Sequence, residues 1–349
     1  MILSKYISFC VKKEYFCSMK KEMITKIAKE TILSIQKIEL SQLNISDYDR
    51  DFFKCLLSTI HYCFDIYTDA IVRLLPDDDE GVPDYFVDFG GGEGFLSVFL
   101  KRLGLNVIYC DICHSSAQAV AILKKETGYG PDYIVEGSSQ ALRSFCQSRS
   151  LLPKYLIATD LIEHVYDLNA LFADLRALNP DMSMVFTTGS VKSNILKSKK
   201  MRRMMVEEDR LVYTPVRKQF LQENYPDMPS GEMEKLAKST RGLTFPDMKA
   251  HVDVYLKTNT LPVLDIDGYN TCDPQTGNWS ERILSKKQYR EILANHHFQV
   301  CFENGYYNVI RRHPAISALA KTVNFFIRRF RRPGSLITPF IFLTIRRSG

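Results

Sequence analysis

The sequence predicts an α/β fold built on one open, mostly parallel sheet. Between residues 84 and 190, short apolar runs alternate with segments of helical periodicity, which is the pattern of successive βαβ units. The first apolar run breaks into a glycine-rich turn at Gly90 and then passes into a helix. A helix and two more apolar runs follow residue 280, so we expect seven strands, the last of them antiparallel.

The first eighty residues predict a helical N-terminal cap, residues 1–80. Apolar residues at three- and four-residue steps indicate one helix through 23–40 and a second, opened by Ser46, that ends at Pro76. An acidic loop at 77–81 then separates the cap from the domain that carries the sheet.

The sheet domain is expected to begin with five strands. They are predicted at 85–89, 106–110, 133–136, 155–159 and 183–187, with helices over 95–103 and 116–127 between them. A helix from Leu168 has the clearest boundaries, because Asp167 is a suitable N-cap and Asn179-Pro180 ends the apolar stripe.

Residues 191–280 interrupt this pattern and are rich in basic, aromatic and turn residues. A loop of that length inside a compact domain is usually functional, so we predict an insertion after strand five that covers the substrate. The sheet pattern resumes with a helix at 285–294 and an antiparallel hairpin of 298–302 with 306–310. The sheet domain thus comprises 81–190 and 281–312.

The glycine-rich turn indicates a nucleotide pocket. It contains one acid and three glycines, which are Asp88, Gly90, Gly92 and Gly94. Glycines let a ligand lie against the backbone, and the next helix directs its free N–H groups toward it. The dinucleotide fingerprint GxGxxG does not fit, because its third glycine would be Phe95 or Ser97.

This spacing resembles motif I of the class I S-adenosylmethionine-dependent methyltransferases. The resemblance implies a Rossmann-like seven-stranded sheet and S-adenosyl-L-methionine as the cofactor. Ligands of such sheets bind at the carboxyl ends of strands. By resemblance, Asp111 would hold the ribose, and Ile112 and Asp160 would also belong to the cofactor-binding residues. Ser138 stands where the family commonly has an acid for the adenine amino group, and a serine hydroxyl accepts that bond more weakly.

The segment 159–165 contains Glu163 and His164 and resembles the Glu-His-Val signature of ubiquinone-type O-methyltransferases and their small-molecule relatives. An alcohol acceptor must lose a proton, and a histidine that titrates near neutrality is the natural base. We therefore expect His164, with Glu163, to be catalytic. The alternative is that the pair only braces the cofactor loop. Three further histidines are alternative bases, although surface or packing roles explain each of them: His251, His296 and His297.

Cysteine usage and hydropathy favour a cytoplasmic protein. Nine cysteines without repeated close pairing do not form a disulfide framework. Cys110 and Cys113 lack the second pair that a zinc site needs, so no metal is predicted. The start of the chain does not resemble a signal peptide, and no run of about 20 apolar residues could span a membrane.

Positive charge is concentrated near the end of the sequence. Residues 304–349 contain nine Arg and Lys and no Asp or Glu, whereas residues 1–303 have a net charge of −3. We predict a basic amphipathic C-terminal tail, 313–349, that suits an anionic surface at the inner face of a membrane. The alternative is a helix packed on the protein itself or on a second subunit. Nucleic acid is a less suitable partner, because the arginines alternate with Phe and Ile.

The resemblance implies methyl transfer, and we expect a hydroxyl of a small molecule, a sugar or glycan intermediate, or a lipid-linked precursor as the acceptor. Four residues of the insertion and its flanks are candidates for the acceptor pocket: Tyr213, Arg217, Arg241 and Tyr255. Two other hypotheses are a cofactor-binding scaffold without turnover and a nucleic-acid methyltransferase. The latter is disfavoured because segment 160–163 lacks the Asn/Asp-Pro-Pro-Tyr/Phe motif.

Overall fold

A computed structural model describes residues 21–43, 47–75, 85–264, 266–310 and 313–349. Its sheet consists of β1 (Tyr85–Phe89), β2 (Asn106–Asp111), β3 (Tyr133–Glu136), β4 (Tyr155–Thr159), β5 (Ser183–Thr188), β6 (Phe298–Asn304) and β7 (Ile341–Arg347). The strand order is β3-β2-β1-β4-β5-β7-β6, and β7 is antiparallel to both of its neighbours. The predicted Rossmann-like sheet of seven strands with a reversed last strand is confirmed.

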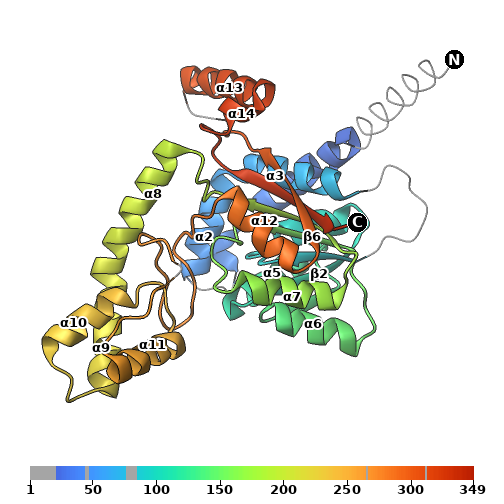
Figure 1. The fold of residues 1–349 in the computed structure, drawn as a ribbon. Coiled ribbons are helices and arrows are strands. Elements are labelled where there is room, and N and C mark those ends of the chain that lie inside the picture. Colours follow the sequence, from blue (N-terminus) through green and yellow to red (C-terminus); the bar gives the residue numbers. More distant parts are fainter. Residues whose placement is uncertain (1–20, 44–46, 76–84, 265, 311–312) are drawn as a thin grey trace.

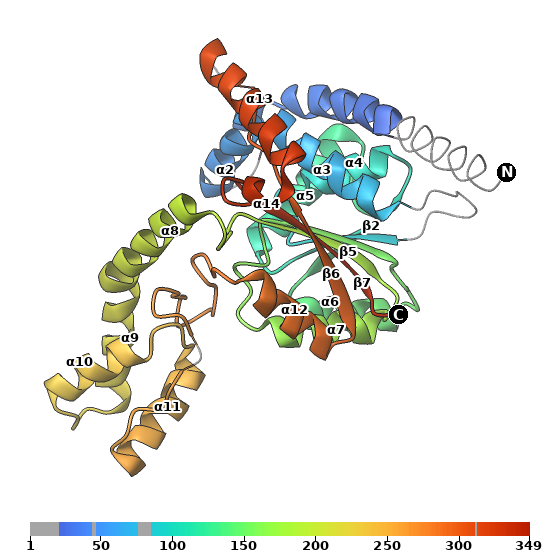
Figure 2. The same ribbon diagram turned by 45° about the horizontal axis from the view of Figure 1, so that its top comes forward.

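Helices cover both faces of the sheet (Figure 2). One layer contains α6 (Ser139–Ser148), α7 (Leu168–Leu178) and α12 (Lys286–Asn295). The other contains a helix over residues 21–36, η1 (Leu40–Gln42), α2 (Asp47–Ser58), α3 (Ile60–Leu74), α4 (Phe95–Arg102) and α5 (His114–Thr127). Because neighbouring strand residues face opposite ways, Leu156 packs in the first core and Ile157 in the second.

The N-terminal helices form part of this second layer. Ile24 and Phe64 are buried in the same core as Phe99 of α4. The helix expected to run from Ser46 to Pro76 is instead two helices, α2 and α3, which meet at Thr59, where the backbone leaves helical geometry (φ −122°, ψ 11°). Ser46 and the expected boundary at 77–83 lie outside the described residues.

The insertion is helical, although its composition predicts a loop. It contains α8 (Ile195–Glu208), the π-helical turn η2 (Asp209–Tyr213), α9 (Thr214–Asn224), α10 (Ser230–Ser239) and α11 (Phe245–Thr258). These helices project to one side of the sheet domain (Figure 1). They can do so because they enclose a core of their own, which includes Leu221, Leu236 and Met248.

A buried ion pair joins the helices of the insertion. Arg217 is fully buried, and its Nη2 donates to Oδ1 of Asp209 at 2.9 Å, while Arg241 lies 2.9 Å from the other carboxylate oxygen. Tyr255 is buried in the apolar core of the insertion. Arg217 and Tyr255 are therefore buried and hold the insertion together, contrary to the expectation that they line an acceptor pocket, whereas Arg241 is partly exposed and its place in such a pocket stays a prediction. Tyr213 donates to Glu208 within the same region.

The predicted hairpin of 298–302 with 306–310 is also wrong. β6 pairs along its whole length with β7, while the chain leaves the sheet at Gly305. The residues between them include α13 (Pro314–Arg329) and α14 (Arg331–Gly334). Residues 341–343 are almost completely buried, which suits a strand inside the sheet. The last part of the predicted tail is thus a component of the sheet domain. Among the described residues, no helix combines the length and apolar character needed to cross a membrane.

Candidate cofactor and active site

The glycine-rich turn needs its glycines for conformation and for close packing. Gly90, Gly92 and Gly94 have φ values of +65°, +49° and +78°, in the left-handed region. A Cβ atom on Gly94 would lie 2.1 Å from Cγ2 of Val120, so glycine allows α4 to begin against α5. The N–H of Gly90 donates to the carbonyl oxygen of Cys110 at 2.7 Å, which ties the turn to β2.

Asp88 lies beneath this turn. Its carboxylate is buried, and its Oδ2 is 2.6 Å from the hydroxyl oxygen of Ser97 in α4. Burial raises the pKa of Asp88 from 3.8 to about 7, against the opposing effect of the Ser97 hydrogen bond. Asp88 thus supports the turn from below, and its expected contact with a cofactor stays a prediction.

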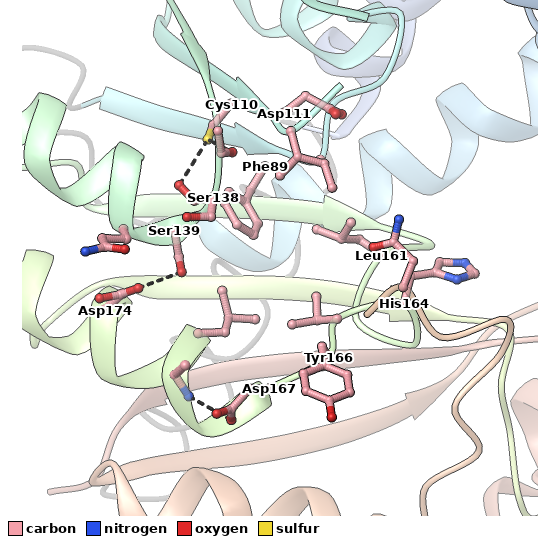
Figure 3. Close-up of a pocket in the computed structure, with 18 of the residues that line it drawn as sticks. Phe89, Cys110, Asp111, Ser138, Ser139, Leu161, His164, Tyr166, Asp167 and Asp174 are labelled. Atoms are coloured by element: carbon pink, nitrogen blue, oxygen red, sulfur yellow. Dashed lines mark hydrogen bonds between the residues drawn. The ribbon is translucent and has the colours of Figure 1, made fainter. Parts of the chain in front are cut away.

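A cavity of about 330 Å³ opens at the carboxyl ends of β1, β2 and β3. Figure 3 shows Asp111 and Ser138 on its walls, with Tyr166 and Asp167 opposite Asp111. Five of the predicted site residues line it: Gly90, Asp111, Ile112, Ser138 and His164. The other five are not part of the cavity wall in the described structure: Asp88, Gly92, Gly94, Asp160 and Glu163. The volume lies within the range of small-molecule sites.

The Asp111 carboxylate is held in place by two main-chain donors. The N–H of Gly92 donates to its Oδ2 at 3.0 Å, and the N–H of Cys113 donates to its Oδ1 at 2.8 Å. A carboxylate has about four lone-pair positions, so two acceptor positions are left for hydroxyl groups in the cavity. These two acceptor positions fit the two hydroxyl donors of a ribose.

The end of the cavity near Ser138 contains an acid that sequence reasoning missed. Asp174 of α7 lines the cavity, accepts a hydrogen bond from the hydroxyl of Ser139 at 2.8 Å and forms an ion pair with Arg143 at 2.8 Å. In the sequence, Asp174 is one polar residue between apolar positions of a helix, and nothing there distinguishes it from a solvent-exposed side chain.

His164 has a defined tautomer in its neutral form. Its Nδ1 lies 2.8 Å from the main-chain carbonyl oxygen of Trp279. A carbonyl oxygen only accepts, so Nδ1 carries the proton and the lone pair of neutral His164 is on Nε2. The side chain lines the cavity and is partly exposed (Figure 3).

Glu163 does not line the cavity and lies in a different environment from His164. It is 0% exposed, and its Oε1 accepts a hydrogen bond from the N–H of Gly189 at 2.8 Å. Burial, reinforced by Asp160, holds the pKa of Glu163 well above its ordinary value. Asp160 has a positive φ of +56°, and its N–H donates to the carbonyl oxygen of Thr187 at 3.1 Å. Both residues connect the ends of β4 and β5.

The return segment of the insertion, residues 271–280, packs directly on residues 160–167, which follow β4. The Trp279 ring stacks on Tyr166 with 5.8 Å between ring centroids, and its Nε1 donates to the Tyr166 carbonyl oxygen at 3.2 Å. The Tyr166 hydroxyl in turn donates to Asp247 of α11 at 2.5 Å. Sequence reasoning missed Tyr166 and Trp279, because they are far apart in the chain and belong to no motif.

The alternative bases lie outside the cavity. His251 is buried in the insertion, and burial lowers its pKa. His296 follows α12, with its Nε2 3.3 Å from Oδ1 of Asn169, and burial and then Arg176 lower its pKa. His297 follows it with a positive φ of +56°. None of these three lines the cavity described here. The described residues also contain no cluster of three or more side chains able to hold a metal ion.

Comparison with known proteins bears on the identity of this site. Residues 60–225, which run from α3 into the insertion, match a family model described as a methyltransferase domain. A search of curated proteins finds no match. The matched region includes the glycine-rich turn, Asp111 and the segment with His164.

Several solved structures are similar over much of the chain. A methyltransferase of Methanosarcina mazei is 12% identical, with 80% of this chain and 96% of that chain covered and a TM-score of 0.42. One from Archaeoglobus fulgidus is 12% identical, with 76% and 86% covered and a TM-score of 0.34. Phosphoethanolamine N-methyltransferase 2 of Haemonchus contortus is also 12% identical, with 82% and 53% covered and a TM-score of 0.39.

The sheet topology, the cavity at the glycine-rich turn and the match of residues 60–225 to a methyltransferase domain all support an enzyme that transfers methyl groups. The acceptor positions on Asp111 fit S-adenosyl-L-methionine as the cofactor, which would supply an electrophilic methyl group on sulfur.

Proposed function

We propose that this enzyme methylates a hydroxyl group and that His164 removes the proton of the acceptor. The observation that carries the proposal is the hydrogen bond from Nδ1 of His164 to the Trp279 carbonyl oxygen, since it leaves Nε2 as the basic atom. A base of this kind accelerates proton removal by about 10²–10⁴-fold. The histidine of the ubiquinone-type O-methyltransferase signature would then be the base, and Glu163 a brace.

The proposed cofactor contacts follow the walls of the cavity. Asp111 accepts from the ribose hydroxyls, Ile112 packs against the adenine, and Ser138 with Asp174 provides polar groups at the adenine end. Gly90 lets the methionine portion approach the backbone. Asp88, Gly92, Gly94 and Asp160 maintain the shape of the turn and of the neighbouring strand ends.

For the acceptor, we propose a small molecule, a sugar or glycan intermediate, or a lipid-linked precursor. The return segment of the insertion supports this, because its Thr276 and Asn278 line the cavity and Trp279 holds His164. Domain 191–280 would thus cover the substrate. A cytoplasmic location at the inner face of a membrane accords with the exposed apolar residues of α13, which include Ile316, Leu319 and Phe326.

The test compares His164→Asn with His164→Ala. Asparagine can still donate to the Trp279 carbonyl but has no basic nitrogen, so we expect both variants to lose roughly a hundredfold or more in turnover while S-adenosylmethionine affinity changes little. Methyl-labelled cofactor would be incubated with fractionated cell extract, and calorimetry would measure cofactor binding.

Two results would contradict the proposal. Unchanged turnover in His164→Asn would remove the histidine from the role of base and leave it as a brace. Label that enters nucleic acid, rather than the small-molecule, glycan or lipid fraction, would contradict the proposed acceptor class.

A further inference from the structure

The protein has a second cleft, which is lined mainly by basic residues and does not include the glycine-rich turn. It is bounded by α13, α14, the end of β6 and α3, and it has a volume of about 500 Å³. Figure 1 shows α13 and α14 next to each other at the top of the view. Six of the residues that line it are basic, namely Lys21, Arg73, Lys286, Arg328, Arg331 and Arg332, and two are acidic, Asp69 and Glu303.

The two acids are already paired. Arg73 binds Glu303 through Nε at 3.0 Å and through Nη2 at 3.3 Å, and Lys21 lies 2.7 Å from Asp69. Within the described part of the chain, no salt bridge neutralises the other four cations: Lys286, Arg328, Arg331 and Arg332. The cleft therefore has an excess of positive charge, which Asp65 offsets in part through its electrostatic interaction with Arg328.

These cations lie on ordered elements of the fold. The side chain of Asn304 at the end of β6 donates to the carbonyl oxygen of Arg331 at 2.8 Å, which fixes α14 to the sheet. The guanidinium carbon of Arg328 lies 5.3 Å from the Tyr306 ring centroid. Lys286 begins α12, and burial, reinforced by Arg290, lowers its pKa, as expected for a cation without a counterion.

We infer that this cleft binds the phosphate group of an anionic phospholipid. Phosphate offers several acceptor oxygens, which match the forked donors of the three arginines and the point charge of Lys286. The cleft also has room for a headgroup larger than phosphate alone. The inference deepens the membrane contact proposed above by naming the group that is recognised.

The surface of α13 favours a lipid over a soluble phosphate. Ala320, Asn324 and Ile327 are buried against the protein, whereas an adjacent apolar stripe is exposed, as Leu319 (63%) and Phe326 (39%) show. Arg328 is on this same helix and lines the cleft. A cationic phosphate site beside an apolar stripe is the arrangement expected of a helix that lies in the surface of an anionic bilayer.

The experiment measures binding of the full chain to sedimented vesicles of phosphatidylcholine, with or without phosphatidylglycerol. We expect binding only when phosphatidylglycerol is present. The triple variant Arg328→Gln, Arg331→Gln, Arg332→Gln should bind roughly 100-fold more weakly, because each basic residue near an anionic surface contributes about fivefold. The matched control Lys125→Gln, Lys249→Gln, Lys257→Gln removes three exposed cations from α5 and α11 and should bind like the wild type.

A second variant separates the site from the membrane contact on which it rests. Leu319→Ser with Phe326→Ser should weaken vesicle binding but preserve the binding of glycerol 1-phosphate, measured by calorimetry.

If this variant loses vesicle binding while the arginine variant does not, the phosphate site is refuted and the membrane contact stands. Equal losses in the arginine variant and its lysine control would also refute the site. Tight binding of glycerol 1-phosphate without any vesicle binding would refute a lipid source. Cofactor affinity and thermal melting confirm that each variant is folded.

Discussion

Nδ1 of His164 lies 2.8 Å from the carbonyl oxygen of Trp279, which is 115 residues further along the chain. This contact connects the proposed base, at the end of β4, with the return segment of the insertion. The N–H of Trp279 also donates to the carbonyl oxygen of His164 at 3.2 Å, so each residue donates one hydrogen bond to the main-chain carbonyl oxygen of the other. The insertion is therefore part of the machinery that positions the histidine.

Asp111→Asn should weaken cofactor binding about tenfold or more. The amide has one oxygen and presents N–H groups toward the ribose hydroxyls, so acceptor positions in the cavity are lost while the size of the side chain is kept. Isothermal titration with S-adenosylhomocysteine would measure the effect. Asp181→Asn, at an exposed carboxylate on the loop before β5, should bind like the wild type. Equal affinity in Asp111→Asn and wild type would place the ribose elsewhere.

Glu163→Gln should retain turnover, because the amide oxygen can still accept from the N–H of Gly189 and the native carboxyl has a raised pKa that favours its neutral form. Glu163→Ala should instead destabilise the enzyme by about 1–3 kcal/mol, since a buried donor loses its partner. Urea unfolding and methyl transfer would be measured on both variants. A large loss of turnover in a fully folded Glu163→Gln would give this residue a catalytic role.

The raised pKa of Asp88 predicts that the folded protein becomes less stable as the pH rises. Because its pKa is raised from 3.8 to about 7 in the folded protein, the folded state keeps a proton that the unfolded state releases. The contribution of Asp88 to the free energy of unfolding is roughly 4 kcal/mol. It is fully present below pH 3.8 and is lost as the pH rises toward 7. Asp88→Asn should flatten this dependence.

Chemical denaturation between pH 4 and pH 8 would check the Asp88 prediction. Asp181→Asn serves as the control and should reproduce the wild-type slope. If Asp88→Asn keeps the same slope as the wild type, the carboxyl is not protonated in the folded protein.

Gly94→Ala should destabilise the enzyme much more than Gly104→Ala. Both glycines have positive φ, +78° and +82°, so each substitution costs about 1–2 kcal/mol in backbone conformation. Only at Gly94 does the new Cβ meet another atom, Cγ2 of Val120 at 2.1 Å, whereas nothing lies within 4 Å of a Cβ at Gly104. Thermal melting would measure the difference. Equal melting temperatures would show that α4 and α5 move apart without cost.

The sequence was sufficient for most of the parallel sheet. β1, β3 and β4 match their predicted ranges, because each is a short apolar run bounded by turn residues. β7 was missed, because its apolar run follows Pro339 and lies next to a basic helix, which favours an interpretation as a surface segment. Residues 306–310 alternate like a strand, but Tyr306 turns into the helical layer, where its carbonyl oxygen accepts from the hydroxyl of Tyr62.

The site was predictable only where a motif specifies it. Strand ends that meet at one edge of the sheet bring Gly90, Asp111 and Ser138 together, as a parallel topology requires. The sequence does not show which of two neighbours faces the cavity, and so Glu163 could not be separated from His164. Trp279 and Asp174 reach the site through tertiary packing, which leaves no local pattern.

The position of β7 has a consequence for synthesis of the protein. This strand enters between β5 and β6, both of which precede it in the chain, and β6 pairs with no other strand in the described sheet. Until residues 341–347 have left the ribosome, β5 and β6 each expose an unpaired edge of the kind that promotes aggregation. A nascent chain that stalls before Ile341 would thus be a natural client for a chaperone, even though its glycine-rich turn had long been translated.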